Sequence, residues 1–273
     1  MGERRRAPVK VVVLVKHVPD EAADQGSDAG VFAADLTVDR AALTCRLSEP
    51  DAYAVEQAMR IARRRLDVQI CAVTMGPAGA VRTLRRALAL GADEAVHIVD
   101  DALHGSDALA TSLVLAAAVQ RLGFDLVICG AASTDSGMAV LPAMVAERLG
   151  VPAACDADTV WVGEDEVVVR HDDGDAVEEI AVTLPAVVSV TDRAGEPRYP
   201  SFRSIVEARQ KAVRTWSLAD LRISTADVGL RASPTVVVRV QACPQERPAV
   251  LVQGEARGAA ARLAKYLTEH QLI

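Results

Sequence analysis

The chain has 273 residues, of which 51% are hydrophobic, 25% charged and only 3% aromatic. This composition can bury a sizeable core, built mostly from Ala, Val and Leu, and excludes a disordered chain. The net charge is −7. An acidic chain without a long basic stripe argues against binding to nucleic acid or to an anionic membrane.

No segment has the pattern of a membrane span or a leader peptide. The apolar run at residues 11–15 ends at Lys16, which makes it too short for either. Five scattered cysteines without a CxxC pair exclude a zinc ribbon and argue against a disulfide framework. We therefore expect a cytoplasmic chain.

Short apolar runs alternate with helix-period segments over the first two-thirds of the chain. Residues 9–15, 68–74, 95–99 and 126–129 are predicted to be buried strands. Helices are predicted after them, with apolar faces formed by Ala54, Ala58, Ile61 and Ala62, by Val81, Leu84 and Leu88, by Leu109, Leu113, Ala116 and Ala117, and by Leu141, Met144, Val145 and Leu149. This alternation indicates βαβ units and a Rossmann-like parallel sheet in an α/β fold.

The pattern changes in the last third of the chain. Residues 167–170 and 177–182 are predicted to form a β-hairpin around Asp172, Asp173 and Gly174, and residues 186–190 another buried strand. After Val213 an irregular chain is expected, punctuated by Pro234, Pro244 and Pro248, before an amphipathic helix with Ala260, Leu263, Ala264 and Leu267 on one side. We divide the chain into an α/β domain, residues 1–213, and a C-terminal arm, residues 214–273.

Three segments are expected to meet at the carboxyl edge of the sheet, where ligands bind in such folds. They are residues 14–20, 74–77 and 130–138. The third, G-A-A-S-T-D-S-G-M, is rich in small residues and hydroxyls, which suits a ribose or a phosphate. The alternative is an ordinary Ser/Gly loop that caps a helix. Neither GxGxxG nor a P-loop sequence is present.

The sequence contains no catalytic constellation. The five histidines lack metal-ligand spacing, and His97 is expected to be packed in a strand. The run H-G-S-D at residues 104–107 is predicted to be a loop and helix cap rather than part of a triad. The aspartates of the hairpin turn are expected to be solvated, and Cys71 and Cys129 to behave as small hydrophobes. The residues alone therefore predict a nucleotide-binding α/β module.

Motifs in a fixed order resemble the β subunit of electron transfer flavoproteins. They are V-K-H-V-P-D at residues 15–20, A-L-A-L-G-A-D at 87–93, residues 125–135, and L-P-A-V-V-S-V at 184–190 followed by E-P-R-Y-P-S-F at 196–202. The proline in the first motif is similar to the nitrogen-fixation and actinobacterial branch. The resemblance runs from residue 9 to about residue 213, and the terminal helix fits it too.

The resemblance implies one half of a heterodimer. In this family the α subunit carries most of the FAD site, and the β subunit holds AMP or, in bifurcating members, a second FAD. Electrons come from acyl-CoA-type or other flavin dehydrogenases and pass to a quinone oxidoreductase or another acceptor. The chain is thus expected to be an electron carrier rather than an enzyme, without membrane insertion. The alternatives are a two-flavin bifurcating member and a stand-alone adenine-nucleotide sensor similar to universal stress proteins, which share this sheet type.

The family's nucleotide site maps onto the same strand ends. The implied residues are Leu14, Ser48, Asp51, Met75, Gly130, Ala131, Ala132, Ser133, Thr134, Asp135, Ser136, Gly137, Met138 and Leu141. Leu14 and Met75 are expected to form walls for an adenine. The hydroxyls and Asp135 are expected to hydrogen-bond ribose or phosphate, with Gly137 allowing close approach.

The family's partner-recognition loop maps onto residues 193–204, with Glu196, Arg198, Tyr199 and Phe202 as the docking residues. Phe202 stands where the family places a Leu that anchors on the dehydrogenase; alternatively it staples a helix beginning near Ser204. Arg198 is expected either to face the flavin or to form an interface salt bridge. The C-terminal helix is expected to dock on the α subunit.

The chain departs from the family pattern at three places. Gly195 replaces an Asn, which predicts a more flexible loop. V-L-P at residues 140–142 replaces a Gln-Thr-Gly that contacts phosphate, and S-E-P at residues 48–50 replaces Asn-Pro-Phe, which brings Glu49 close to the phosphate. We expect an occupied site whose phosphate contacts are redistributed.

Overall fold

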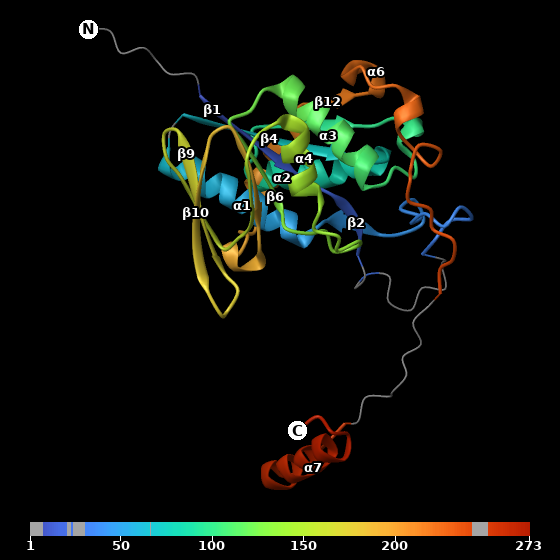
Figure 1. Cartoon of the computed structure of the whole chain (residues 1–273), viewed down its shortest axis with the longest axis vertical. Coiled ribbons are helices and arrows are strands. Elements are labelled where there is room, and N and C mark those ends of the chain that lie inside the picture. Colours follow the sequence, from blue (N-terminus) through green and yellow to red (C-terminus); the bar gives the residue numbers. More distant parts are fainter. Residues whose placement is uncertain (1–7, 21–22, 24–30, 66, 242–250) are drawn as a thin grey trace. The chain divides into compact units, whose positions relative to one another are not determined.

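The computed structural model describes residues 8–20, 23, 31–65, 67–241 and 251–273. The chain forms two compact units, Met1–Val236 and Val237–Ile273. The first contains a seven-stranded sheet in which every strand pair is parallel (Figure 1). Its order is β12 (Val213–Trp216), β5 (Glu94–Ile98), β4 (Val68–Met75), β1 (Val9–Leu14), β6 (Leu126–Gly130), β11 (Ala186–Val190) and β7 (Ala153–Ala157). The predicted Rossmann-like α/β fold is confirmed.

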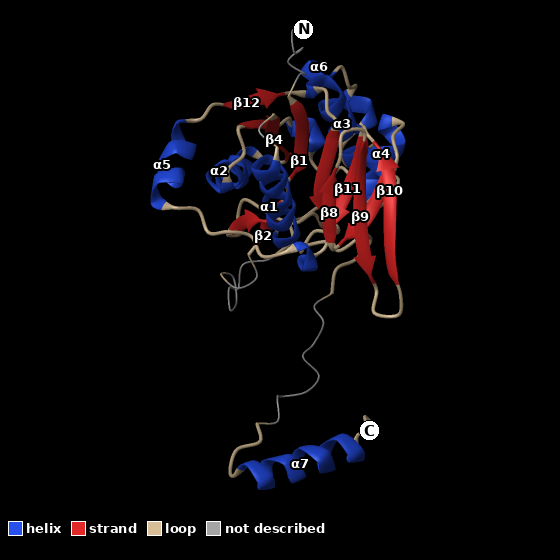
Figure 2. Cartoon of the chain, turned by 90° about the vertical axis from the view of Figure 1, so that its left-hand side faces the viewer, coloured by secondary structure: helices blue, strands red, loops and turns tan. Residues whose placement is uncertain are grey.

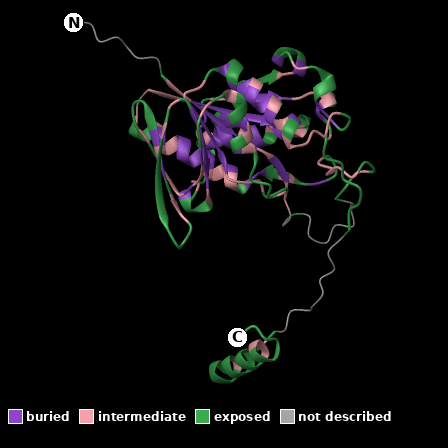
Figure 3. Cartoon of the chain, in the orientation of Figure 1, coloured by how far each residue is buried: buried purple, intermediate pink, exposed green. Residues whose placement is uncertain are grey.

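Helices cover both faces of this sheet (Figure 2). Alternate residues of β1 divide between two cores: Val11 and Val13 pack with α1 (Glu49–Arg64) and α2 (Val81–Leu90). Val12 and Leu14 pack with α3 (Ala108–Leu122) and α4 (Leu141–Leu149) on the other face. Because β1, β6 and β11 are buried on both faces, their sequences are nearly continuous apolar runs (Figure 3).

Smaller elements surround the main sheet. The predicted hairpin is confirmed as β9 (Glu166–Asp172) and β10 (Val177–Thr183), joined by β8 (Thr159–Val162) in an antiparallel sheet. A two-stranded antiparallel sheet follows β1. The remaining elements are β2 (His17–Pro19), β3 (Cys45–Leu47), α5 (Phe202–Gln210), α6 (Leu218–Leu221), and the 3₁₀ turns η1 (Ala78–Ala80), η2 (Asp101–Leu103), η3 (Asp192–Ala194) and η4 (Thr225–Asp227).

The predicted apolar face of α3 is wrong in part: Ala116 is buried and Ala117 packs against the core, but Leu109 and Leu113 do not. Of its four members only Ala116 is buried, and Leu109 is 47% exposed. Ala110, Val114 and Ala118 face the core instead. Since this helix is apolar almost all round, its sequence has no polar stripe that would fix the orientation.

The prediction of an irregular chain after Val213 is also wrong for its first residues, because β12 extends the sheet at one edge and α6 follows it. An edge strand of four residues, V-R-T-W, has too little apolar periodicity to be recognised. The first compact unit continues to Val236. Pro244, Pro248 and Cys243 lie outside the described residues.

The second unit contains the predicted amphipathic helix, α7 (Ala256–Glu269). Its apolar side includes Leu263, which is 51% exposed, and Leu267, which is half-buried. Leu272 and Ile273 beyond the helix are exposed as well. None of the described residues of the second unit is buried, so among them this helix covers no apolar core.

Gly130, at the end of β6, lies directly against the first turn of α1. A Cβ atom added there would lie 2.6 Å from Pro50 Cβ and 2.7 Å from the Pro50 carbonyl carbon. Real side chains do not approach backbone so closely, so the sequence requires glycine where this strand meets this helix.

We predict that Gly130→Ala lowers the free energy of unfolding by about 1–3 kcal/mol through overpacking, measured by urea denaturation. The matched control is Gly79→Ala, where the nearest atom to a Cβ would be Arg82 Nη2 at 3.5 Å. This control should change stability little. Equal losses in both variants would contradict the close-approach argument.

Candidate functional site

The carboxyl ends of three adjacent strands form the candidate site. β1 lies between β4 and β6, so Leu14, Met75 and Gly130 end at the same edge of the sheet. The three segments expected to meet there do so. The N-terminus of α1 and the loop of residues 131–140 complete this edge.

Asp51, in the first turn of α1, ties two of these strand ends together. Its buried carboxylate accepts the Lys16 N–H at 2.7 Å and the Gly130 N–H at 3.2 Å. Burial raises the pKa of the Asp51 carboxyl to about 7, against the two backbone hydrogen bonds and the Lys16 charge, which lower it. Both oxygens thus hold backbone at the base of the site.

Lys16 and Arg40 converge on one carboxylate in the loop. Lys16 Nζ donates to Asp135 Oδ1 at 2.7 Å, to Ser133 Oγ at 3.1 Å and to Ser136 Oγ at 3.4 Å. Arg40 Nη2 lies 2.6 Å from Asp135 Oδ2. Burial raises the pKa of Asp135, but the hydrogen bonds and charges of its partners outweigh burial and hold this pKa below its usual value. Two cations therefore face a single ionised carboxylate.

The backbone of the loop is fixed at several points. Ser48 Oγ, fully buried, accepts the Thr134 N–H at 3.4 Å, and the Gly137 N–H donates to the Ser133 carbonyl at 2.9 Å. Gly137 has φ +59°, a conformation that favours glycine. No side chain caps α4, whose N-cap position is Val140. The loop hydroxyls therefore do not serve as a cap for the following helix.

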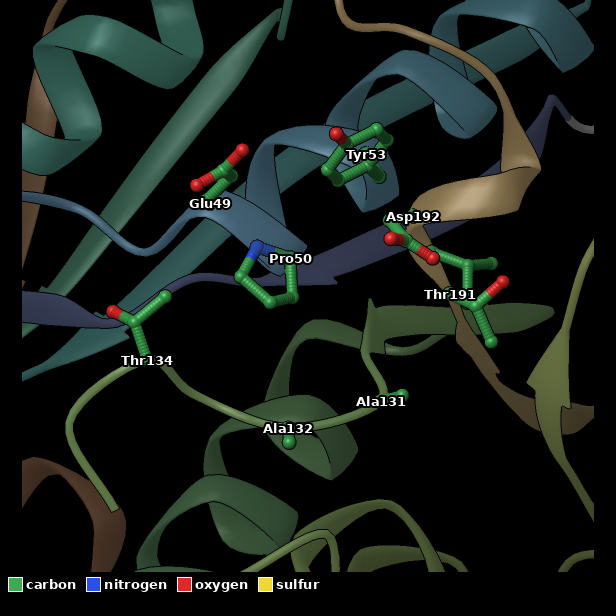
Figure 4. Close-up of a pocket in the computed structure, with 9 residues that line it drawn as sticks. Glu49, Pro50, Tyr53, Ala131, Ala132, Thr134, Thr191 and Asp192 are labelled. Carbon is green, nitrogen blue, oxygen red and sulfur yellow. The ribbon is translucent and has the colours of Figure 1, made fainter. Parts of the chain in front are cut away.

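A cavity of about 410 Å³ opens beside this loop (Figure 4). Its walls come from α1, from the loop and from the end of β11: Glu49, Pro50 and Tyr53; Ala131, Ala132 and Thr134; Val190, Thr191 and Asp192. Its volume lies in the range of small-molecule sites, roughly 300–1,000 Å³. Glu49 and Asp192 make its outer wall acidic, whereas Lys16 and Arg40 lie on the side of Ser133 and Asp135.

The residues expected to bind nucleotide occupy different places in this structure. Ala131, Ala132 and Thr134 line the cavity, while Ser133, Asp135 and Ser136 surround Lys16 Nζ. Leu14 and Met75 pack in the core on the α3 side, together with Leu141, and Met138 is 58% exposed. The cavity does not include these four residues.

The residues expected from sequence to bind nucleotide do not include five that lie at this edge, although Lys16 belongs to the segment 14–20 expected there. They are Lys16, Arg40, Tyr53, Thr191 and Asp192. Lys16 and Thr191 each follow a buried strand, and that position is a usable signal. Arg40 lies 95 residues from Asp135 in an irregular segment, where no pattern indicates the contact.

The segment after β11 presents two aromatic side chains to solvent, since Tyr199 is 91% and Phe202 83% exposed. α5 begins at Phe202 itself, with Ser201 Oγ accepting the Ser204 N–H at 3.1 Å as its cap. The alternative in which Phe202 staples a helix beginning near Ser204 is therefore wrong. Glu196 is exposed as well.

The base of this docking loop, residues 193–204, is clamped to α1. Arg198 donates from Nε to Glu56 Oε2 at 2.9 Å and from Nη2 to Glu56 Oε1 at 3.2 Å. Gln57 and Arg60 both donate to the Ala194 carbonyl. Gly195 has φ +104°, and a Cβ there would lie 2.7 Å from Arg60 Cζ. This glycine thus lets the loop pass close to Arg60, rather than simply loosening it.

The other residues considered from sequence have structural roles. His97 is buried, and its Nε2 lies 3.1 Å from the Gly76 carbonyl. Asp107 caps α3 by accepting the Ala110 N–H at 3.0 Å, as predicted for the 104–107 run. The described residues contain no cluster of three or more His, Cys, Asp or Glu suited to a metal ion. Within the same residues, no helix is long and apolar enough to cross a bilayer.

Comparison with known proteins gives consistent matches. The family model "Electron transfer flavoprotein domain" matches residues 35–221. "Electron transfer flavoprotein subunit beta" of Mycobacterium tuberculosis is 34% identical over 268 residues, 96% of this chain and 99% of that protein. The protein of the same name from Thermoanaerobacterium thermosaccharolyticum is 30% identical over 266 residues, 97% of this chain and 100% of that protein. The "Caffeyl-CoA reductase-Etf complex subunit CarD" of Acetobacterium woodii is 30% identical over 247 residues, 90% of this chain and 92% of that protein.

Asp51 should make stability depend on pH. Its pKa is raised from 3.8 to about 7 by folding, so between these values the unfolded chain releases a proton that the folded chain retains. This contribution to the free energy of unfolding is full below pH 4 and declines as the pH rises toward 7.

Asp51→Asn cannot titrate. In urea denaturation at a series of pH values, the stability advantage of the wild type over this variant should therefore shrink from pH 4 to pH 7. A difference that stays constant over this range would contradict a raised pKa at Asp51.

Proposed function

The chain belongs to the electron transfer flavoprotein family as a β subunit, and from this premise we propose what its own residues contribute. The family is one of flavin-associated electron carriers, and a β subunit pairs with an α subunit. We propose that this chain, in the cytoplasm, holds an adenine nucleotide at its sheet edge, closes the flavin site of the α subunit and presents a docking loop to redox partners.

The observation that carries the nucleotide proposal is the meeting of Lys16 and Arg40 on the single carboxylate of Asp135, beside the 410 Å³ cavity. This surplus positive charge suits a phosphate, to which the hydroxyls of Ser133 and Ser136 would add hydrogen bonds. Thr134 and the alanines before it would line the ribose and base.

The acidic wall of the cavity sets the orientation of this nucleotide. Glu49 would repel a phosphate, so the phosphate belongs on the Lys16 side, away from α1. This is the redistribution expected from the sequence, since V-L-P at residues 140–142 offers no side-chain donor. The ligand would be AMP, or the adenosine end of a second FAD. A bound flavin supplies the electron-transfer chemistry. The residues of this chain would orient the bound nucleotide.

The docking proposal rests on two exposed aromatics with a fixed base. Because Glu56, Gln57 and Arg60 hold residues 194–198 on α1, Tyr199 and Phe202 are presented with little conformational freedom to lose on binding. An aromatic anchor of this kind suits an apolar pocket on an acyl-CoA-type or other flavin dehydrogenase. A quinone oxidoreductase or another acceptor would then receive the electrons.

The exposed apolar side of α7 supports docking of the C-terminal arm on the α subunit. We retain one second candidate, a two-flavin bifurcating member. The relative from Acetobacterium woodii favours it, because its name places that protein in a caffeyl-CoA reductase complex. A stand-alone nucleotide sensor has no comparable support.

Co-expression with an α subunit, followed by release and quantification of nucleotides per heterodimer, tests the proposal. One FAD and one AMP support a plain electron carrier, whereas two FAD support the bifurcating candidate. A stable heterodimer whose only nucleotide is one FAD would contradict nucleotide binding by this chain. Failure to form a flavin-containing heterodimer would overturn the proposed function as a whole.

We predict that Lys16→Met lowers AMP content per heterodimer at least tenfold while leaving the α subunit's FAD in place, because a charge-assisted hydrogen bond to phosphate is lost. Lys211→Met is the control: its Nζ donates to the Ala92 carbonyl, far from the site in the fold. Unchanged AMP content in the Lys16 variant would remove Lys16 from the phosphate site.

Phe202→Ser should weaken reduction of the heterodimer by a flavin dehydrogenase at least tenfold, seen as a higher KM for the heterodimer, with bound nucleotide unchanged. Phe32→Ser, at another partly exposed phenylalanine, should leave the KM unaltered. If the two variants behaved alike, Phe202 would not be the anchor.

A further inference from the structure

A second cavity, of about 120 Å³, lies between α1 and β8. Its lining residues are Gln57, Arg60, Ile61, Arg64, Arg65, Thr159, Val160, Trp161 and Val162. None of them lines the larger cavity at the sheet edge. A water takes about 30 Å³ of liquid, so the space corresponds to about four waters, enough for a tetrahedral oxyanion.

The charged side chains known to line this cavity are all positive. Three arginines line it, and among the described residues no Asp or Glu does, in a chain whose net charge is −7. Arg64 makes no hydrogen bond or ion pair with the described residues. Arg60 donates to the Ala194 carbonyl and lies 3.6 Å from Glu56 Oε1. Arg65 donates to the Gly163 carbonyl and, at 3.4 Å each, to the two carboxylate oxygens of Asp67. Arg64 is therefore the arginine of this cavity whose positive charge meets no carboxylate in the part of the chain that the structure describes.

The position of the arginines is not explained by the helix alone. The C-terminus of a helix attracts cations, which accounts for Arg64 in the last turn of α1. Arg60 lies one turn earlier and Arg65 follows the helix, yet all three converge on one space. Arg60 and Arg64 are four residues apart, a spacing at which like charges on a helix repel. A bound anion would remove that repulsion.

We propose that this cavity binds a phosphate-type oxyanion, either inorganic phosphate or the phosphate of a small phosphomonoester. Guanidinium groups match the geometry of such oxygens and donate two hydrogen bonds at once. Thr159 adds a hydroxyl donor, and Trp161, 40% exposed, forms an aromatic wall of the site. This site shares no lining residue with the cavity at the sheet edge, and it adjoins the base of the docking loop through Gln57 and Arg60.

Trp161 also provides the readout. The chain has two tryptophans, so Trp216→Phe in the full-length chain leaves Trp161 as the only one. Titration with inorganic phosphate at constant ionic strength, balanced with sodium chloride, should give a saturable change in Trp161 emission. Calorimetric titration of the wild-type chain with phosphate provides a second measurement that does not depend on the substitution.

Arg64→Ala should weaken phosphate binding at least tenfold in both measurements, since a charged donor without another partner is lost. Arg86→Ala is the matched control, an exposed arginine on α2 that forms no ion pair with the described residues. Tighter binding of glycerol 3-phosphate than of phosphate would identify a phosphomonoester as the ligand, and the reverse order the free ion. An equal response to chloride, or equal affinity in the Arg64 and Arg86 variants, would overturn the proposal.

Discussion

The buried carboxylate of Asp51 is the interaction on which the site depends. By accepting the backbone N–H groups of Lys16 and Gly130, it fixes the start of α1 against the ends of β1 and β6. Because a Cβ atom at residue 130 would lie 2.7 Å from the Pro50 carbonyl carbon, no side chain fits between the end of β6 and the start of α1. With the backbone of Lys16 fixed in this way, its side chain reaches the loop of residues 131–140 and organises the hydroxyls around Nζ. A buried acid of this kind is costly without partners, and its two partners are the strand ends.

α1 connects the surfaces of the first unit to which we assign a role. Its first turn lines the larger cavity through Glu49 and Tyr53. Its middle holds the base of the docking loop through Glu56, whose carboxylate also faces Arg63 at 2.7 Å. Its last turn contributes to the arginine-lined cavity. Because one helix of 16 residues spans these places, the nucleotide edge and the docking loop share a single support.

The sequence predicts what short-range patterns encode. Continuous Val and Ile runs identify the central strands, and the order of strands and helices places the 130–138 loop at the ligand-binding edge. Contacts between distant segments leave no such pattern: Arg40 and Asp135 are 95 residues apart, and Glu56 and Arg198 are 142 apart. The orientation of α3 and the edge strand β12 were missed for a related reason, because a helix that is apolar all round and a strand of four residues carry too little periodicity. Arg198 illustrates the limit best, because no short-range pattern indicates its pairing with the carboxylate of Glu56 on α1.

The central claim is that this chain holds a nucleotide at the carboxyl edge of β1 and β6. Hydrogen–deuterium exchange on the heterodimer tests it most directly, comparing the complex stripped of AMP with the same complex after AMP is restored. The account predicts slower exchange in the backbone amides of residues 130–138 and in the first turn of α1, with the second unit unaffected. Protection confined to other segments, with residues 130–138 exchanging at the same rate in both states, would contradict it.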